Sequence, residues 1–98
     1  MSTSRPDQQF WDITDAVIQA ANAQCDLAPR TKVASAAMFA AARFNVFVLA
    51  TTVEGSADLA ARSDEAVAYL TDQFGKMLRD NLREYEQNFD RYVAQARG

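Results

Sequence analysis

Histidine is absent from this 98-residue chain, and cysteine occurs only once, as Cys25. Without histidine the chain cannot build a Ser–His or Cys–His catalytic relay, a histidine-containing zinc site or a histidine pH switch. One cysteine cannot form an intramolecular disulfide, so the composition does not indicate an oxidising compartment. Acidic residues outnumber basic ones by 13 to 10, and the net charge of −3 argues against nucleic acid as a partner.

Proline and glycine are also scarce, with two prolines and three glycines in the chain. No proline follows Pro29, and residues that favour helices are plentiful after it. Apolar and polar residues do not alternate over any sustained stretch, which argues against β-strands. The sequence therefore predicts an all-α protein. Its length suits one domain, which we place at residues 6–98 behind a flexible tail at residues 1–5.

Three long helices are expected from the spacing of apolar residues and from helix-capping signals, over about residues 6–25, 31–52 and 63–95. Ser4 and Asp7 have the spacing of a capping box at the start of the first helix. Thr31 and Ser63 belong to the residue types favoured at the N-cap, so they should begin the second and third helices. Residues 57–62 fit either a loop or an early helical turn.

The third helix is expected to break. Its apolar residues recur at about 3.6 residues per turn from Val67 to Ala96, the period of a straight α-helix. One helix over residues 63–95 would be about 50 Å long, whereas a compact domain of this size is about 35 Å across. We expect a break near Asp80 and Asn81, with Asn81 and Glu84 capping a fourth helix. The alternative is a projecting helix end that packs on another copy.

The second helix should lie at the centre of a compact bundle. Residues 33–53 are apolar on nearly every face, so neighbouring helices must surround them. The segment is also long enough to span a bilayer. Arg43 lies in its middle, however, and a central arginine costs about 2.5–3.5 kcal/mol on insertion scales. We therefore predict a bundle of three long helices, the third broken to give a fourth, with no membrane span.

Arg43 is the main candidate for a functional side chain, because it is the only charge in residues 33–53. A buried arginine keeps its charge and needs a carboxylate or carbonyl groups around it. Pairing the helices as antiparallel neighbours places Arg43 level with Asp15 and Asp72. We predict a buried Arg43–Asp15 pair, supported by Asp72 or Asn45. It is either a structural ion pair or part of a clamp for an anionic ligand.

Three aromatic residues, Tyr85, Phe89 and Tyr92, form a stripe near the C-terminus. They continue the core spacing of the third helix, so they pack either in the core or in a subunit interface. Arg79, Arg83 and Arg91 do not form a basic patch, because acidic residues alternate with them, and no nucleic-acid binding is expected.

Catalytic and metal-binding signals are weak. Cys25 could be a reactive thiol, but a helix C-terminus disfavours the thiolate, and as a small apolar side chain on the stripe of Trp11 and Ile18 it needs no special role. Asp12 and Asp15 lie on adjacent positions of the first helix and could bind a cation, yet two carboxylates are too few for a metal site. We therefore assign no catalytic residue, cofactor or metal, and leave open whether the protein is an enzyme.

Three segments of the chain form a recognisable pattern: Phe10-Trp11 with residues 16–24, residues 33–47 (VASAAMFAAARFNVF), and residues 74–92. This pattern resembles a family of short, uncharacterised proteobacterial proteins catalogued as domain of unknown function 3144. The resemblance spans about residues 8–93, and the run AAARFN at residues 40–45 is its most specific part. It implies a small soluble helical protein and no assigned activity, cofactor or catalytic residue.

These observations favour a non-enzymatic interaction or scaffold module that associates with itself, most simply as a dimer, and with an unknown protein partner. The alternative is a small-molecule binder or unconventional enzyme that uses Arg43 and a carboxylate. Residues 1–9 are polar and lack the apolar stretch of a signal peptide, so we expect a cytoplasmic protein.

Overall fold

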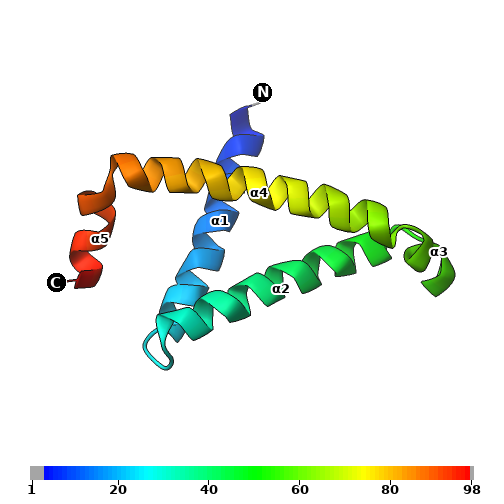
Figure 1. The fold of residues 1–98 in the computed structure, drawn as a ribbon, viewed down its shortest axis with the longest axis horizontal. Helices are drawn as coiled ribbons and strands as arrows, with labels where there is room; N and C mark the ends of the chain where they lie inside the picture. Colours follow the sequence, from blue (N-terminus) through cyan, green and yellow to red (C-terminus); the bar gives the residue numbers. More distant parts are fainter. Residues whose placement is uncertain (1–3, 98) are drawn as a thin grey trace. The chain divides into compact units, whose positions relative to one another are not determined.

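The computed structural model describes residues 4–97 of the chain, with side chains over residues 7–94. Residues 1–3 of the expected tail, residue 98 and the Ser4 side chain of the expected capping box lie outside the described residues. The described part contains five α-helices and no β-strand, which confirms the all-α prediction (Figure 1). In chain order they are α1 (Ser4–Gln24), α2 (Arg30–Ala50), α3 (Ser56–Ala61), α4 (Ser63–Gln87) and α5 (Phe89–Arg97).

The five helices belong to two units of the chain. Residues 1–52 contain α1 and α2, which contact each other, and residues 53–98 contain α3, α4 and α5. In the second unit, α4 contacts both of the shorter helices. A single domain over residues 6–98 would require these two units to pack together, and it stays a prediction.

A tight turn joins α1 to α2. The backbone N–H groups of Leu27 and Ala28 both donate to the carbonyl of Gln24, at 2.9 and 3.0 Å, and so close the last turn of α1. Pro29 then caps α2, because its extended backbone (φ −59°, ψ 145°) turns its carbonyl toward the N–H groups of Lys32 and Val33. The expected N-cap at Thr31 is therefore wrong by two residues. Proline suits the cap because its fixed φ and missing N–H cost a helix nothing there.

The C-terminus of α2 is closed by two threonines. The hydroxyl of Thr51 donates to the carbonyl of Val48 at 2.6 Å, and that of Thr52 donates to Leu49 at 2.7 Å. These hydroxyls add to the backbone contacts, because the N–H of Thr51 also donates to the Val48 carbonyl at 3.2 Å and that of Thr52 to the Leu49 carbonyl at 2.9 Å. The helix itself ends at Ala50, two residues before the expected end.

The second unit begins with the short helix α3. The sequence predicted either a loop or an early helical turn at residues 57–62, and the structure has a helix there. Asp58 holds α3 at both ends: one carboxylate oxygen accepts from the backbone N–H of Glu54 at 3.2 Å, and the other pairs with Arg62 Nε at 3.3 Å. Ser63 is the first residue of α4 rather than its N-cap, a position that Arg62 occupies. The Ser63 hydroxyl instead donates to the carbonyl of Leu59 at 3.3 Å.

The expected break in the third long helix occurs, but at Asn88 rather than near Asp80 and Asn81. The amide of Asn81 donates to the Met77 carbonyl at 2.8 Å inside an unbroken α4, so it caps nothing. At Asn88 the backbone leaves the helical region (φ −128°, ψ 32°), and the chain changes direction between α4 and α5 (Figure 1).

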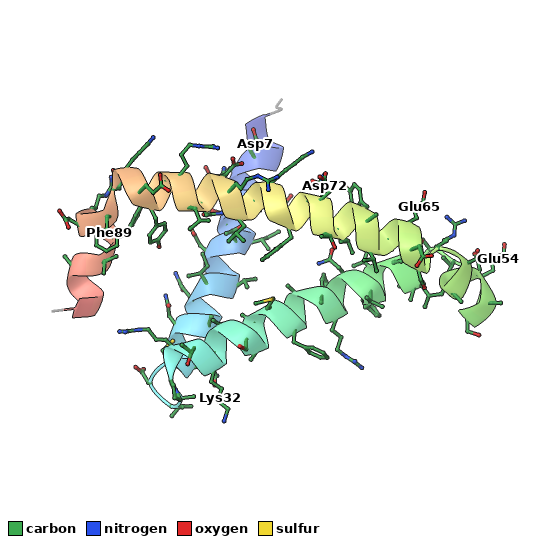
Figure 2. All side chains as sticks on the ribbon, viewed as in Figure 1. Asp7, Lys32, Glu54, Glu65, Asp72 and Phe89 are labelled. Carbon is green, nitrogen blue, oxygen red and sulfur yellow. The ribbon has the colours of Figure 1, made fainter. Side chains whose placement is uncertain are left out.

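No apolar side chain is buried among the described residues. Twenty large apolar side chains are exposed, from 45% at Phe89 to 80% at Leu27. Side chains project on both sides of α2 in the view of Figure 2. Because these apolar faces are exposed in the described residues, the compact bundle of three long helices stays a prediction.

Candidate functional site

One candidate binding surface is the apolar stripe of α4, formed by Val67, Leu70, Phe74, Leu78 and Tyr85. These residues recur every three to seven positions and so share one side of the helix. Charged residues occupy the opposite side, where Lys76 Nζ pairs with Asp72 Oδ2 at 3.2 Å and Arg83 pairs with Asp80 at 3.3 Å. This separation is typical of a helix that packs against another helix.

The α2 surface differs, because apolar residues surround it on every side. Arg43 is the one charged residue beyond its first turn. Its side chain is exposed, and it makes no ion pair or hydrogen bond within the described part of the chain. Asn45, the other polar residue nearby, donates its amide to the Ala41 carbonyl at 2.8 Å.

The residues expected around Arg43 are therefore not assembled within the first unit. Asp15 is exposed on α1, and no ion pair joins it to Arg43 in residues 7–52. Asp72, labelled in Figure 2, lies on α4 in the second unit and has Lys76 as its partner. Burial of Arg43 beside Asp15 stays a prediction for a state in which the apolar faces of α1 and α2 are covered.

The three aromatic residues expected at an interface lie at the junction of α4 and α5, and the structure pairs two of them. The rings of Tyr85 and Tyr92 stack with centroids 4.4 Å apart and planes inclined by 27°. Phe89, labelled in Figure 2, is the first residue of α5 and is 45% exposed. Whether this cluster lies in an interface stays a prediction.

Polar contacts surround the same tyrosine pair. The Tyr92 hydroxyl donates to Glu84 Oε2 at 2.5 Å, and the Arg91 guanidinium lies 5.6 Å from the centre of the Tyr92 ring. The hydrogen bond to Glu84 raises the pKa of Tyr92 above its ordinary value of 10.0, because it stabilises the protonated phenol. The negative charge of Glu84 raises that pKa further.

Sequence reasoning gave Glu84 a different role, as a capping residue for a helix starting at Asn81. Glu84 and Tyr92 are eight residues apart, whereas side chains on a helix surface contact partners three or four residues away. Spacing rules for a continuous helix therefore could not find this pair. The available signal was Asn88, a weak helix former in a stretch otherwise rich in helix formers.

The described side chains contain no group of three or more potential metal ligands among histidine, cysteine, aspartate and glutamate. Cys25 is a free thiol, half-buried in the turn between α1 and α2.

Among the described helices, α2 is the one long and apolar enough to cross a membrane, judged by length and composition. The core helix of a soluble protein and a signal sequence near an N-terminus meet the same criterion.

Comparison with protein-family models identifies the family of this chain. A family model described as a protein of unknown function, DUF3144, matches residues 10–86. The chain belongs to the DUF3144 family. The resemblance carried by residues 33–47 is thereby confirmed, and the DUF3144 match ends two residues before the break at Asn88. No curated protein and no solved structure matches the chain.

Proposed function

We propose that this DUF3144 protein is a non-enzymatic helical interaction module whose apolar helix faces are covered by a second copy of the chain. The observation that carries the proposal is the exposure of every large apolar side chain along α2 and α4, apart from a few that are half-buried. Water-exposed apolar surface on this scale destabilises a single chain, and association removes it from water.

The exposed area supports an obligate partner. The chain exposes 8499 Å², whereas a folded monomer of 10.8 kDa exposes about 5,500 Å². The difference is about 3,000 Å² per chain, or about 6,000 Å² for two copies, which exceeds the roughly 2,000–5,000 Å² that obligate dimer interfaces bury in total, so contacts within each chain also contribute to covering it.

Packing around α2 favours a second copy over the chain's own helices. Helices pack at interaxial distances of 8–10 Å, so about six neighbours of equal width surround a central helix. One chain supplies only two other long helices, α1 and α4, and these would leave several sides of α2 in water. In a dimeric bundle, α1, α2 and α4 of the second copy join α1 and α4 of the same chain around each α2, so that five long helices cover most of its sides.

We place this assembly in the cytoplasm rather than in a bilayer. Asn45 and Arg43 both lie near the middle of α2, where a lipid environment penalises polar groups. In a protein bundle the same groups have access to carboxylates and carbonyls of neighbouring helices.

Light scattering of the purified full-length chain at tens of micromolar tests the proposal. We expect the mass of a dimer, and we expect Phe74→Lys, which places a charge on the apolar stripe of α4, to reduce it to a monomer. Ala68→Lys adds the same charge on the polar side of α4 and serves as the matched control. A monomer mass for the unmodified chain contradicts the proposal, and so does flotation of that monomer with phospholipid vesicles, which would assign α2 to a membrane.

A further inference from the structure

Asn81 lies within α4 and Asn88 is its C-cap, seven residues later, and comparing their surroundings indicates what breaks the helix. Asn81 and Asn88 make the same local contact: each side-chain amide donates to the carbonyl four residues earlier, Met77 at 2.8 Å and Glu84 at 3.1 Å. The helix continues through Asn81 and breaks at Asn88. The asparagine contact therefore does not explain the break by itself.

The surrounding residues differ at two positions that matter. A tyrosine lies four residues after each asparagine, Tyr85 in the first case and Tyr92 in the second. Four and three residues before Asn81 are Met77 and Leu78, whereas Asn88 has Glu84 and Tyr85 at those places. Only the second set contains a carboxylate that accepts the tyrosine hydroxyl and an aromatic ring that stacks on it.

The tyrosine stack requires a bent chain. In a straight helix, residues seven apart are separated by about 10.5 Å along the axis, and both side chains lean toward the N-terminus, so the rings stay apart. The observed centroid distance between Tyr85 and Tyr92 is 4.4 Å. The side chains of Glu84, Tyr85 and Tyr92, which we call the Tyr92 clasp, therefore meet only because the chain bends.

Nothing in the local sequence prevents a continuous helix instead. Residues 76–97 contain neither proline nor glycine, and no described residue near the break has a positive φ. In a straight helix Tyr92 falls on the same side as Phe74 and Tyr85, because eighteen residues make five full turns. The apolar stripe of α4 would then extend from Val67 to Tyr92, lengthening from about 27 Å to about 38 Å.

We propose that the break at Asn88 is the closed state of a hinge. The Tyr92 clasp holds α5 at an angle to α4, and release of the clasp joins α4 and α5 into one helix with an uninterrupted apolar stripe. The hinge sets the length of the binding surface that α4 presents. Since the contacts of the clasp all lie within residues 84–92, the hinge does not depend on the proposed self-association.

Distance measurement by pulsed electron paramagnetic resonance tests the hinge. Spin labels are attached at Thr71→Cys and Ala94→Cys in the full-length chain, with Cys25→Ser to remove the native thiol. Labelled chains are diluted into excess unlabelled protein, so that only intrachain distances contribute whether or not the protein dimerises. A continuous helix places the two positions about 35 Å apart, and the closed hinge gives a shorter distance.

The deciding variant carries Glu84→Met and Tyr85→Leu, which copies the residues found around the unbroken Asn81. We expect its distance to shift to about 35 Å. Tyr92→Phe keeps the ring and removes the hydroxyl, and it should shift part of the population in the same direction. Asn81→Ala is the matched control and should leave the distance unchanged, and circular dichroism checks that each variant stays helical.

A distance of about 35 Å in the parent chain overturns the proposal, because the hinge would then be open already. A shorter parent distance that persists in both helical clasp variants also overturns it, because the break would not depend on the clasp.

Discussion

The phenol of Tyr92 donates a 2.5 Å hydrogen bond to the carboxylate of Glu84, eight residues earlier in the chain. Partners at this separation lie about 12 Å apart along a straight helix, so the bond accompanies the bend at Asn88. It joins the end of α4 to α5 and lies beside the Tyr85–Tyr92 stack. Tyr92 therefore serves as a reporter of whether the hinge is closed.

The Tyr92 clasp should weaken at alkaline pH. Glu84 raises the pKa of Tyr92 above 10.0, so the folded state holds the phenol proton more tightly than the unfolded chain does. The stabilisation is therefore fully present below pH 10.0 and is lost as the pH rises through the raised pKa. Glu84→Ala should move the Tyr92 transition in a tyrosinate absorbance titration to lower pH.

The neighbouring carboxylate provides the control for this titration. Glu86→Ala removes the same charge but leaves the hydrogen bond between Tyr92 and Glu84 in place, so the Tyr92 transition should stay at higher pH than in Glu84→Ala. Identical titrations of the two variants would contradict a specific role for Glu84.

Phe74→Ala tests whether the apolar stripe of α4 is covered in the assembled protein. The side chain is 52% exposed in the single chain. If a second copy covers it, its loss should reduce the free energy of unfolding by about 3–5 kcal/mol. Urea denaturation measures this loss, and the midpoint should rise with protein concentration. A loss below about 0.5 kcal/mol, as expected for Arg83→Ala on the charged side, would show that Phe74 remains in water.

A double-mutant cycle tests the predicted pairing of Arg43 with Asp15. If the assembled bundle buries the pair, Arg43→Met or Asp15→Leu alone should each cost about 3–5 kcal/mol, because one charge stays buried without its partner. The combined variant should cost much less than the two losses together. The free energy of unfolding is measured for all four proteins. Additive losses would indicate that Arg43 and Asp15 do not interact.

Gly75→Ala should stabilise the protein by about 0.5–1 kcal/mol, because glycine in a helix interior loses more backbone entropy on folding than alanine does. The added methyl group would lie 3.6 Å from Nη1 of Arg79, an ordinary contact with a flexible side chain. Thermal unfolding measures the change. A loss of stability would mean that another helix approaches Gly75 closely in the assembled protein.

Local properties of the sequence predicted the helices well. Apolar spacing and the scarcity of proline and glycine led to the three long helices, since each helix depends mainly on interactions within a few residues. Caps were predicted less well. Thr31 and Ser63 have suitable side chains, but Pro29 and Arg62 occupy the cap positions, because the backbone of the preceding turn decides where each helix begins.

The sequence alone determined the helical class and the apolar character of α2, because composition and the spacing of apolar residues carry that information. It also predicted a break in the third long helix, but placed it near Asp80 and Asn81 rather than at Asn88. The position of the break was decided only by tertiary contacts, since the hydrogen bond from Tyr92 to Glu84 and the stack on Tyr85 join residues that a continuous helix keeps apart. Asn81 and Asn88 make the same side-chain contact, and it is the meeting of Glu84 and Tyr85 with Tyr92 that distinguishes the broken helix from the intact one.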